Sequence, residues 1–96
     1  MKRLRLLRPA ETEMLEAAQY YETQTRNLGA EFLGKLETAF KDIATKPERW
    51  PVIRNEVRRR LVHRFPFAVF YRVEPTEVVV LAVAHLRRRP EYWTER

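Results

Sequence analysis

Histidine and arginine side chains gather in two short segments of the second half of the chain. His63 and Arg64 end one strand-like segment, and His85 ends another, two residues before Arg87. A histidine is suited to proton transfer near neutral pH, and fixed guanidinium groups stabilise negative charge that develops on phosphorus. RNA carries its own nucleophile, the 2′-OH, so such a set could cleave a phosphodiester without a metal. Tyr92 follows in the tail, where its ring could stack on a flanking base.

The same cluster also has a simpler interpretation. Arginines at a sheet end stay solvated and block edge-to-edge association, and a histidine at a strand end is more often structural than catalytic. Neither interpretation is excluded by the residues alone. Further candidates for contact with a partner or a nucleic acid are Arg58, Arg60, Arg88, Arg89 and Trp93.

Several classes of site are disfavoured by residues that the sequence lacks. It contains no cysteine, which removes disulfides, thiolate nucleophiles and cysteine-based zinc sites. It contains no glycine-rich phosphate loop, no serine nucleophile elbow and no HExxH motif. Two histidines without a nearby acidic cluster also argue against a transition-metal centre. We therefore expect neither a metal nor a cofactor.

The positive charge is confined to one half of the chain. Residues 1–48 carry eight basic and eight acidic side chains, whereas residues 49–96 carry eleven basic and five acidic ones. The net charge of +6 thus belongs to the second half, where every basic residue is arginine. Arginine is preferred for bidentate contacts with phosphate or carboxylate, which indicates a polyanionic target or an acidic partner. A surface selected for solubility, or a GC-rich coding bias, is the alternative.

The length predicts a single domain over residues 1–96. The first eight residues are basic but lack the apolar run of a signal peptide. The longest apolar stretch, residues 78–84, is too short to span a bilayer. We therefore expect a cytoplasmic protein that does not contact a membrane.

Apolar residues at helical spacing predict two helices after a short strand over residues 2–7. The first helix begins near Pro9, and Glu11, Glu13, Glu16 and Glu22 are expected to lie off its apolar stripe. Gly29 is expected to end this helix as a left-handed cap. Pro47 ends the second helix. The stripes consist of Ala10, Met14, Ala17, Ala18 and Tyr21 in the first helix and Phe32, Leu33, Leu36, Phe40 and Ile43 in the second.

The pattern changes from residue 57 onward to β-branched and aromatic residues typical of strands. We expect strands over residues 57–64, 65–73 and 78–85, with a turn at 74–77 and the last strand internal to the sheet. The predicted fold class is α+β, in the order β-α-α-β-β-β. A helical hairpin should pack on a mostly antiparallel sheet of about four strands.

The four-residue turn also predicts how the last two strands pair. If Val73 pairs with Val78, the following pairs are Tyr71 with Val80, Val69 with Ala82, and Phe67 with Ala84. The aromatic side chains would then share the face that the helices cover, and His85 would lie on the other face beside Pro66. This register brings both histidines to one end of the sheet. A slip of one residue would exchange the faces.

Two long runs of the sequence resemble the RelE/ParE superfamily. Residues 58–73 resemble its basic strand followed by an FPY-x-(I/V)-x-Y strand. Residues 78–93 resemble its closing strand and an AH-x-RR-x-P-x-YW tail. The helical half, with residues 16–21 and the loop from Pro47 to Pro51, is also similar, so the resemblance covers nearly the whole chain.

The resemblance implies a growth-inhibiting toxin of a type II toxin–antitoxin pair, neutralised by an acidic cognate antitoxin that wraps an extended or helical segment over it. RelE-like members cut mRNA in the ribosome with basic residues and a terminal tyrosine or histidine, whereas ParE-like members inhibit DNA gyrase and are not nucleases. The positions that match are His63 or Arg64, His85, Arg87, and Tyr92 or Trp93. The region between helices and strands lacks the lysines of the RelE pattern, which favours ParE-like action slightly. An mRNA endoribonuclease and an inactive binding protein with the toxin fold remain alternatives.

Overall fold

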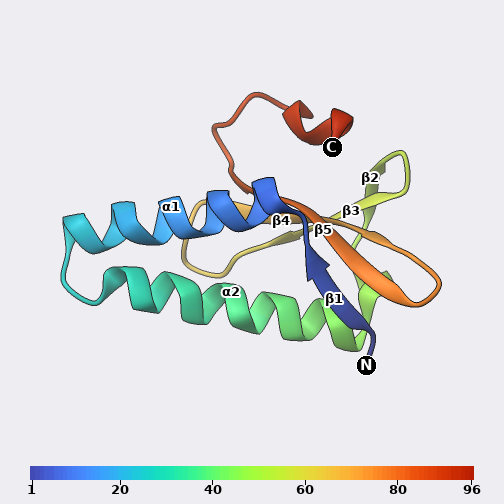
Figure 1. Ribbon diagram of the computed structural model, residues 1–96, viewed down its shortest axis with the longest axis horizontal. Coiled ribbons are helices and arrows are strands. Elements are labelled where there is room, and N and C mark those ends of the chain that lie inside the picture. The colour runs from blue at the N-terminus through green and yellow to red at the C-terminus, as the bar shows by residue number, and fades with distance from the viewer.

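Two antiparallel helices pack on one face of a five-stranded sheet in the computed structural model, which describes all 96 residues (Figure 1). The helices are α1 (Arg8–Gln24) and α2 (Leu28–Thr45). The strands are β1 (Arg3–Leu6), β2 (Val52–Arg54), β3 (Val57–Leu61), β4 (Phe67–Val73) and β5 (Glu77–His85). Short 3-10 helices span Pro47–Arg49 and Tyr92–Glu95.

The sheet order is β1-β5-β4-β3-β2, and only the β1–β5 pair is parallel. The predicted α+β class and the internal position of the last strand are confirmed. The strand count is one higher than expected, because β2 forms where the sequence after Trp50-Pro51 indicates a loop. No helix is long and apolar enough to cross a membrane.

The apolar stripes of the two helices form the main core with β4. Phe32, Leu36 and Ile43 of α2 are fully buried. The ring of Phe32 lies 5.0 Å from that of Phe67 on β4 and 5.2 Å from that of Tyr21 on α1, both in tilted or edge-on contact. Such aromatic pairs add to the apolar area that helix–sheet packing buries. The predicted aromatic face of residues 65–71 is therefore the face that the helices cover.

The connection between the helices differs from the sequence prediction. Asn27, not Gly29, adopts the left-handed conformation, with φ of 72°, and Gly29 is buried inside α2. A Cβ atom on Gly29 would lie 2.4 Å from the Ala18 carbonyl oxygen of α1. The glycine is thus required for close helix approach, not for a cap. The Glu22 carboxylate accepts hydrogen bonds from the backbone N–H groups of Asn27 and Gly29 at the start of α2.

We expect Gly29→Ala to lower the free energy of unfolding by about 1–3 kcal/mol, because the added methyl group forces the two helices apart. The matched control is Gly34→Ala, since nothing lies within 4 Å of a Cβ placed on Gly34 of the same helix. That variant should gain up to about 1 kcal/mol from the higher helix propensity of alanine. Urea unfolding of both variants measures the difference, and equal effects would contradict the role assigned to Gly29.

The pairing of β4 with β5 follows the prediction only near the turn. Val73 pairs with Val78 and Tyr71 with Val80, but a bulge at Leu81 then shifts the register. The predicted pairs of Val69 with Ala82 and of Phe67 with Ala84 are therefore wrong. The observed partners are Val83 for Val69 and His85 for Phe67.

The bulge also exchanges the faces of the end of β5, because one extra residue reverses the alternation of side chains. Leu81 and Ala82 pack with Trp93 on the face away from the helices. Val83 joins the helix-covered core, and the His85 ring contacts the Phe67 ring at 5.1 Å. His85 thus lies on the face opposite to the predicted one.

Candidate functional site

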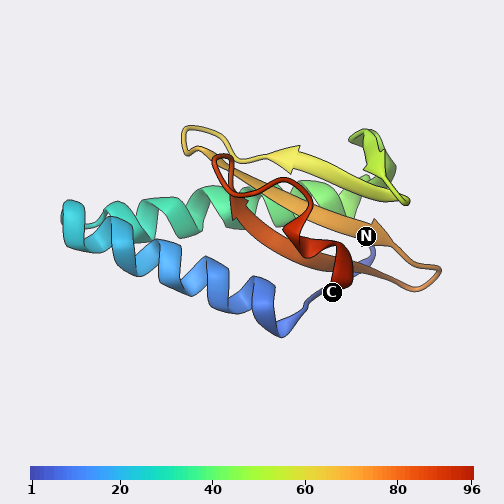
Figure 2. The same cartoon turned by 90° about the horizontal axis from the view of Figure 1, so that it is seen from above.

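Residues 86–96, which we name the tail, cross the sheet face that the helices leave open. Figure 2 shows the tail in front of β5, with β3 and β2 beside it. Trp93 anchors the tail: its side chain is 2% exposed, and its ring stacks on that of Phe70 at 5.1 Å. Val57 and Leu81 complete this second, smaller apolar cluster. The tail is therefore held as part of the fold by apolar burial.

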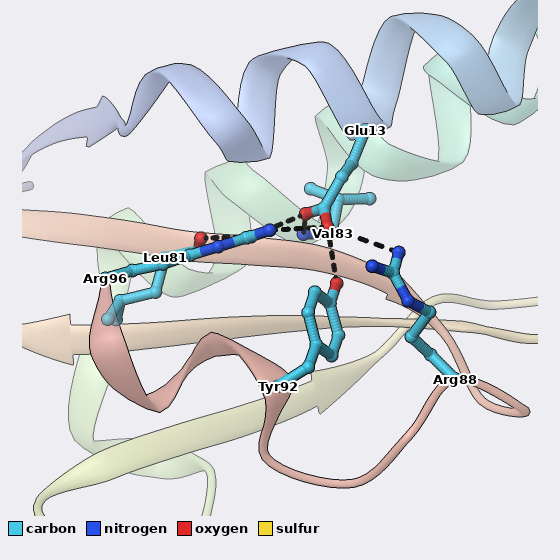
Figure 3. Close-up of polar contacts among 6 residues, drawn as sticks. All are labelled: Glu13, Leu81, Val83, Arg88, Tyr92 and Arg96. Atoms are coloured by element: carbon cyan, nitrogen blue, oxygen red, sulfur yellow. Dashed lines mark hydrogen bonds and ion pairs between the residues drawn. The ribbon is translucent and has the colours of Figure 1, made fainter.

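The Glu13 carboxylate of α1 also holds the tail, through polar contacts. Glu13 accepts hydrogen bonds from the Tyr92 hydroxyl at 2.5 Å and from both terminal nitrogens of Arg96 at 2.9 and 3.0 Å (Figure 3). An Arg88 terminal nitrogen lies 3.8 Å from the same carboxylate. The Glu13 side chain is only 13% exposed and that of Arg96 only 19%, so these contacts are little screened by water.

Glu13 and Arg96 also provide hydrogen-bond partners for backbone groups at the edge of β5. The short strand β1 pairs with β5 only as far as Val80, so on that side the backbone of β5 beyond Val80 has no neighbouring strand, while β4 pairs with its other side. Glu13 accepts the Val83 N–H at 3.1 Å, and Arg96 donates to the Leu81 carbonyl oxygen at 3.0 Å. Buried backbone groups need such partners, so the Glu13–Arg96 pair replaces a missing piece of strand.

Glu13 and Arg96 were not among the residues predicted from sequence. A signal for Glu13 was nevertheless present, because it stands three residues after Ala10 and four before Ala17. Helical spacing places it beside the apolar stripe, not off it as expected. A carboxylate in that position needs a partner, and the tail supplies it.

Tyr92 is a predicted catalytic residue, and its hydroxyl group is engaged in the hydrogen bond to Glu13. Burial raises the pKa of Tyr92 well above its usual range, and the hydrogen bond to Glu13 and the Glu13 charge raise it further. The phenol therefore stays protonated and donates a hydrogen bond to Glu13. The Arg88 and Arg96 guanidinium groups lie 4.0 and 4.9 Å from the centre of its ring. In this arrangement the ring is not free to stack on a base.

His85 is positioned by the start of the tail. Its Nδ1 accepts a hydrogen bond from the Arg87 backbone N–H at 3.0 Å. The lone pair of Nδ1, the atom that would take up a proton, is thus engaged by the backbone, and the other ring nitrogen, Nε2, is left as a hydrogen-bond donor. The Arg87 side chain is exposed.

His63 and Arg64 lie at the same sheet end but border a different hollow. β3 ends at Leu61 beside Ala68, and β5 ends at His85 beside Phe67, so the predicted juxtaposition of strand ends is confirmed. However, an open pocket near Trp50 holds His63, and it shares no lining residue with the hollows that hold His85. Arg64 forms an ion pair with Glu31 of α2. The two histidines thus do not share one site.

Arg58 and Arg60 make contacts within the protein on the helix side of β3. Arg58 donates to the carbonyl oxygens of Glu48 and Trp50 at 3.1 and 2.6 Å. Arg60 donates to Asp42 at 2.5 Å, and its guanidinium lies 5.2 Å from the Trp50 ring centre. Both predicted binding residues therefore hold the segment between α2 and β2 against β3.

A cavity of about 310 Å³ lies between the tail and the sheet. Phe70, Ala84 and Trp93 are among its apolar residues. Arg59 and Arg89 also line it, and their guanidinium groups form no ion pair or hydrogen bond. No group of three histidine, cysteine, aspartate or glutamate side chains is placed to hold a metal ion. The chemistry of this hollow is therefore that of an apolar pocket with unpaired cations.

Comparison with known proteins identifies relatives of this fold. Residues 4–90 match the family model described as ParE toxin of type II toxin-antitoxin system, parDE. A chain from the chromosomal ParDE TA system of P. aeruginosa is similar with a TM-score of 0.78 and 18% identity, over 88% of this chain and 96% of that chain. A chain from the toxin-antitoxin complex RelBE2 of Mycobacterium tuberculosis gives a TM-score of 0.58 and 21% identity, over 88% and 90%. A search of curated protein sequences gives no significant match.

Proposed function

The chain belongs to the family of ParE toxins of type II toxin–antitoxin systems, and we propose that it arrests growth by inhibiting DNA gyrase until a cognate antitoxin neutralises it. The family match spans residues 4–90 and so includes both helices and all of the sheet except Arg3, the first residue of β1. The two similar structures come from systems described as ParDE and as a toxin–antitoxin complex. These descriptions and the family match support an antitoxin as the partner of this chain.

One observation carries the proposal of a toxin that binds its target and is not a nuclease. The groups that metal-free RNA cleavage needs are separated or already occupied. The Tyr92 hydroxyl donates its hydrogen bond to Glu13, and the Nδ1 lone pair of His85 is engaged by the Arg87 N–H. His63 borders a different pocket from His85. A base, an acid and an unpaired cation around one phosphate position are required for efficient general acid–base catalysis.

The alternative of ribosome-dependent mRNA cleavage is favoured by a single feature. His85 stands two residues before the exposed Arg87, and its ring can transfer a proton to an oxygen near a phosphate once Nδ1 is released from the Arg87 N–H. This alternative needs a separate base, for which the sheet end offers His63 only after rearrangement.

Two assays with the purified chain distinguish the mechanisms. We expect it to produce gyrase-dependent double-strand breaks, or to block supercoiling, when added to DNA gyrase, ATP and plasmid DNA. We expect no cleavage of mRNA on stalled ribosomes by primer extension. Cleavage in the codon of the A site, with gyrase unaffected, would replace the proposal by the nuclease alternative. Activity in neither assay would favour the inactive binding protein.

A substitution at His85 separates the mechanisms in cells. If the chain binds gyrase, His85→Ala should leave growth arrest within about threefold of the parent, because no proton transfer is involved. If it cleaves RNA, the loss of the proton donor should reduce the rate by about 10²–10⁴-fold. Growth after induction without antitoxin measures the effect, and thermal melts confirm that the variant is folded. Arg26→Ala, at the exposed turn between the helices, is the control that should retain full toxicity in both cases.

A further inference from the structure

The sheet face away from the helices is only partly covered by the tail. Beside the tail, Ile53 of β2 is 39% exposed, Leu61 of β3 is 52% exposed, and Leu86 at the start of the tail is 52% exposed. Ile53 and Leu86 border the 310 Å³ cavity. Leu61 lines the neighbouring pocket of His63 and shares the face of Arg59, because side chains two residues apart point the same way. We name this surface, with the cavity and its border, the tail groove.

The arginines around the tail groove differ in whether they are paired. Arg54 pairs with Glu91, and Arg88 lies over the Tyr92 ring beside Glu13. Arg59 and Arg89 line the cavity, and neither guanidinium group forms an ion pair or a hydrogen bond. Their unpaired guanidinium groups project beside an apolar hollow, so the charge of the groove is not neutralised within the protein.

We propose that the tail groove is the anchor site for the cognate antitoxin, an inference that rests on the proposed function. A large apolar side chain of an acidic antitoxin segment enters the cavity over Phe70, and carboxylates that flank it pair with Arg59 and Arg89. A cavity of this volume accommodates one such side chain, and unpaired guanidinium groups form bidentate contacts with carboxylates. Docking would also cover Leu61 and Leu86, whose exposure otherwise leaves apolar surface in water.

The chemistry of the groove favours an acidic polypeptide over a nucleic acid. Single-stranded nucleic acids bind by stacking bases on accessible aromatic rings. Here Trp93 is 2% exposed and stacks on Phe70, so neither of these rings offers a free stacking platform. The exposed apolar side chains Ile53, Leu61 and Leu86 suit a protein partner, because apolar side chains of a polypeptide can bury them and a phosphate backbone cannot.

The test uses the purified cognate antitoxin, with titration calorimetry against surface variants. Arg59→Glu and Arg89→Glu should each weaken binding about tenfold, because an attractive pair becomes repulsive. Leu86→Asp should weaken it at least tenfold, because a charge enters the apolar contact. The matched controls are Arg26→Glu and Leu15→Asp, which change an exposed, unpaired arginine and a 54% exposed leucine of the helical hairpin. Both controls should bind within about twofold of the parent.

The outcomes separate this inference from the proposed function. If the parent chain binds the antitoxin tightly and the groove variants bind as the parent does, the antitoxin docks elsewhere and the inference is wrong. If the parent chain binds no antitoxin at all, the proposed function fails as well. If the groove variants keep antitoxin binding but lose binding to a fluorescent single-stranded 20-mer, the groove serves nucleic acid and the inference is overturned. Circular dichroism melts verify that every variant is folded.

Discussion

Replacement of Glu13 by alanine is expected to lower the free energy of unfolding by about 3–4 kcal/mol, the loss usual when one partner of a buried ion pair is removed. The substitution leaves the Arg96 guanidinium without its carboxylate, and it removes the acceptor of both the Tyr92 hydroxyl and the Val83 N–H. When buried polar groups lose their hydrogen-bond partners, the free-energy cost of their desolvation is no longer offset by an interaction. Urea unfolding monitored by circular dichroism measures the change.

Two further variants show whether the effect belongs to this carboxylate. Glu16→Ala changes an exposed carboxylate on the same helix that forms no hydrogen bond or ion pair, and it should change stability by less than about 0.5 kcal/mol. Glu13→Gln should fall between the two, because an amide keeps an acceptor but loses the charge that Arg96 pairs with. An effect of Glu13→Ala no larger than that of Glu16→Ala would show that the tail is held without this contact.

Trp93→Ala is expected to cost about 3–5 kcal/mol, as large-to-small substitutions in a core do. Trp93 is 2% exposed and supplies the largest side chain of the cluster with Val57 and Leu81. Its removal should also free the tail from the sheet, because the stacking contact with Phe70 holds the tail on that face. Trp93→Phe, which keeps a ring against Phe70, is the matched control and should cost less than half as much.

Hydrogen exchange locates the consequence of Trp93→Ala in the molecule. Amides of residues 92–96 and the Val83 amide should exchange much faster than in the parent. The exchange rates of the α2 amides should rise only as far as the lower global stability requires. The double variant with Glu13→Ala should cost less than the sum of the single variants, since each change alone releases the same segment. Full additivity would mean that the Glu13 contact and the Trp93 contact hold the tail independently.

The secondary structure of this protein was largely predictable because its signals are local. Apolar residues at helical spacing and Pro47 mark the helices, and the run from residue 78 to 85 marks the internal strand. The resemblance of residues 58–73 and 78–93 to a toxin superfamily agrees with the family match over residues 4–90. The turn at residues 74–77 also predicted the first pairs of the β4–β5 ladder correctly.

The candidate site was predictable only in outline. The strand order correctly brings the segments with His63 and His85 to one sheet end, but the bulge at Leu81 turns His85 to the helix side. The apolar run of residues 78–84 could not reveal that bulge, because every side chain in it suits either face. The tertiary structure alone decides the bulge.

The sequence by itself determined the fold class, the helical hairpin, the internal strand and the arginine-rich second half, since these depend on residue type and spacing along the chain. Only the tertiary structure decided which charges are free. Glu13 meets Tyr92 across 79 residues of sequence and Arg96 across 83. It is this packing of α1 against the tail that engages Tyr92 and Arg96, while Arg59 and Arg89 stay unpaired at the cavity. Whether a charged side chain is available to a partner depends on its neighbours in space, and residues distant in sequence provide those neighbours.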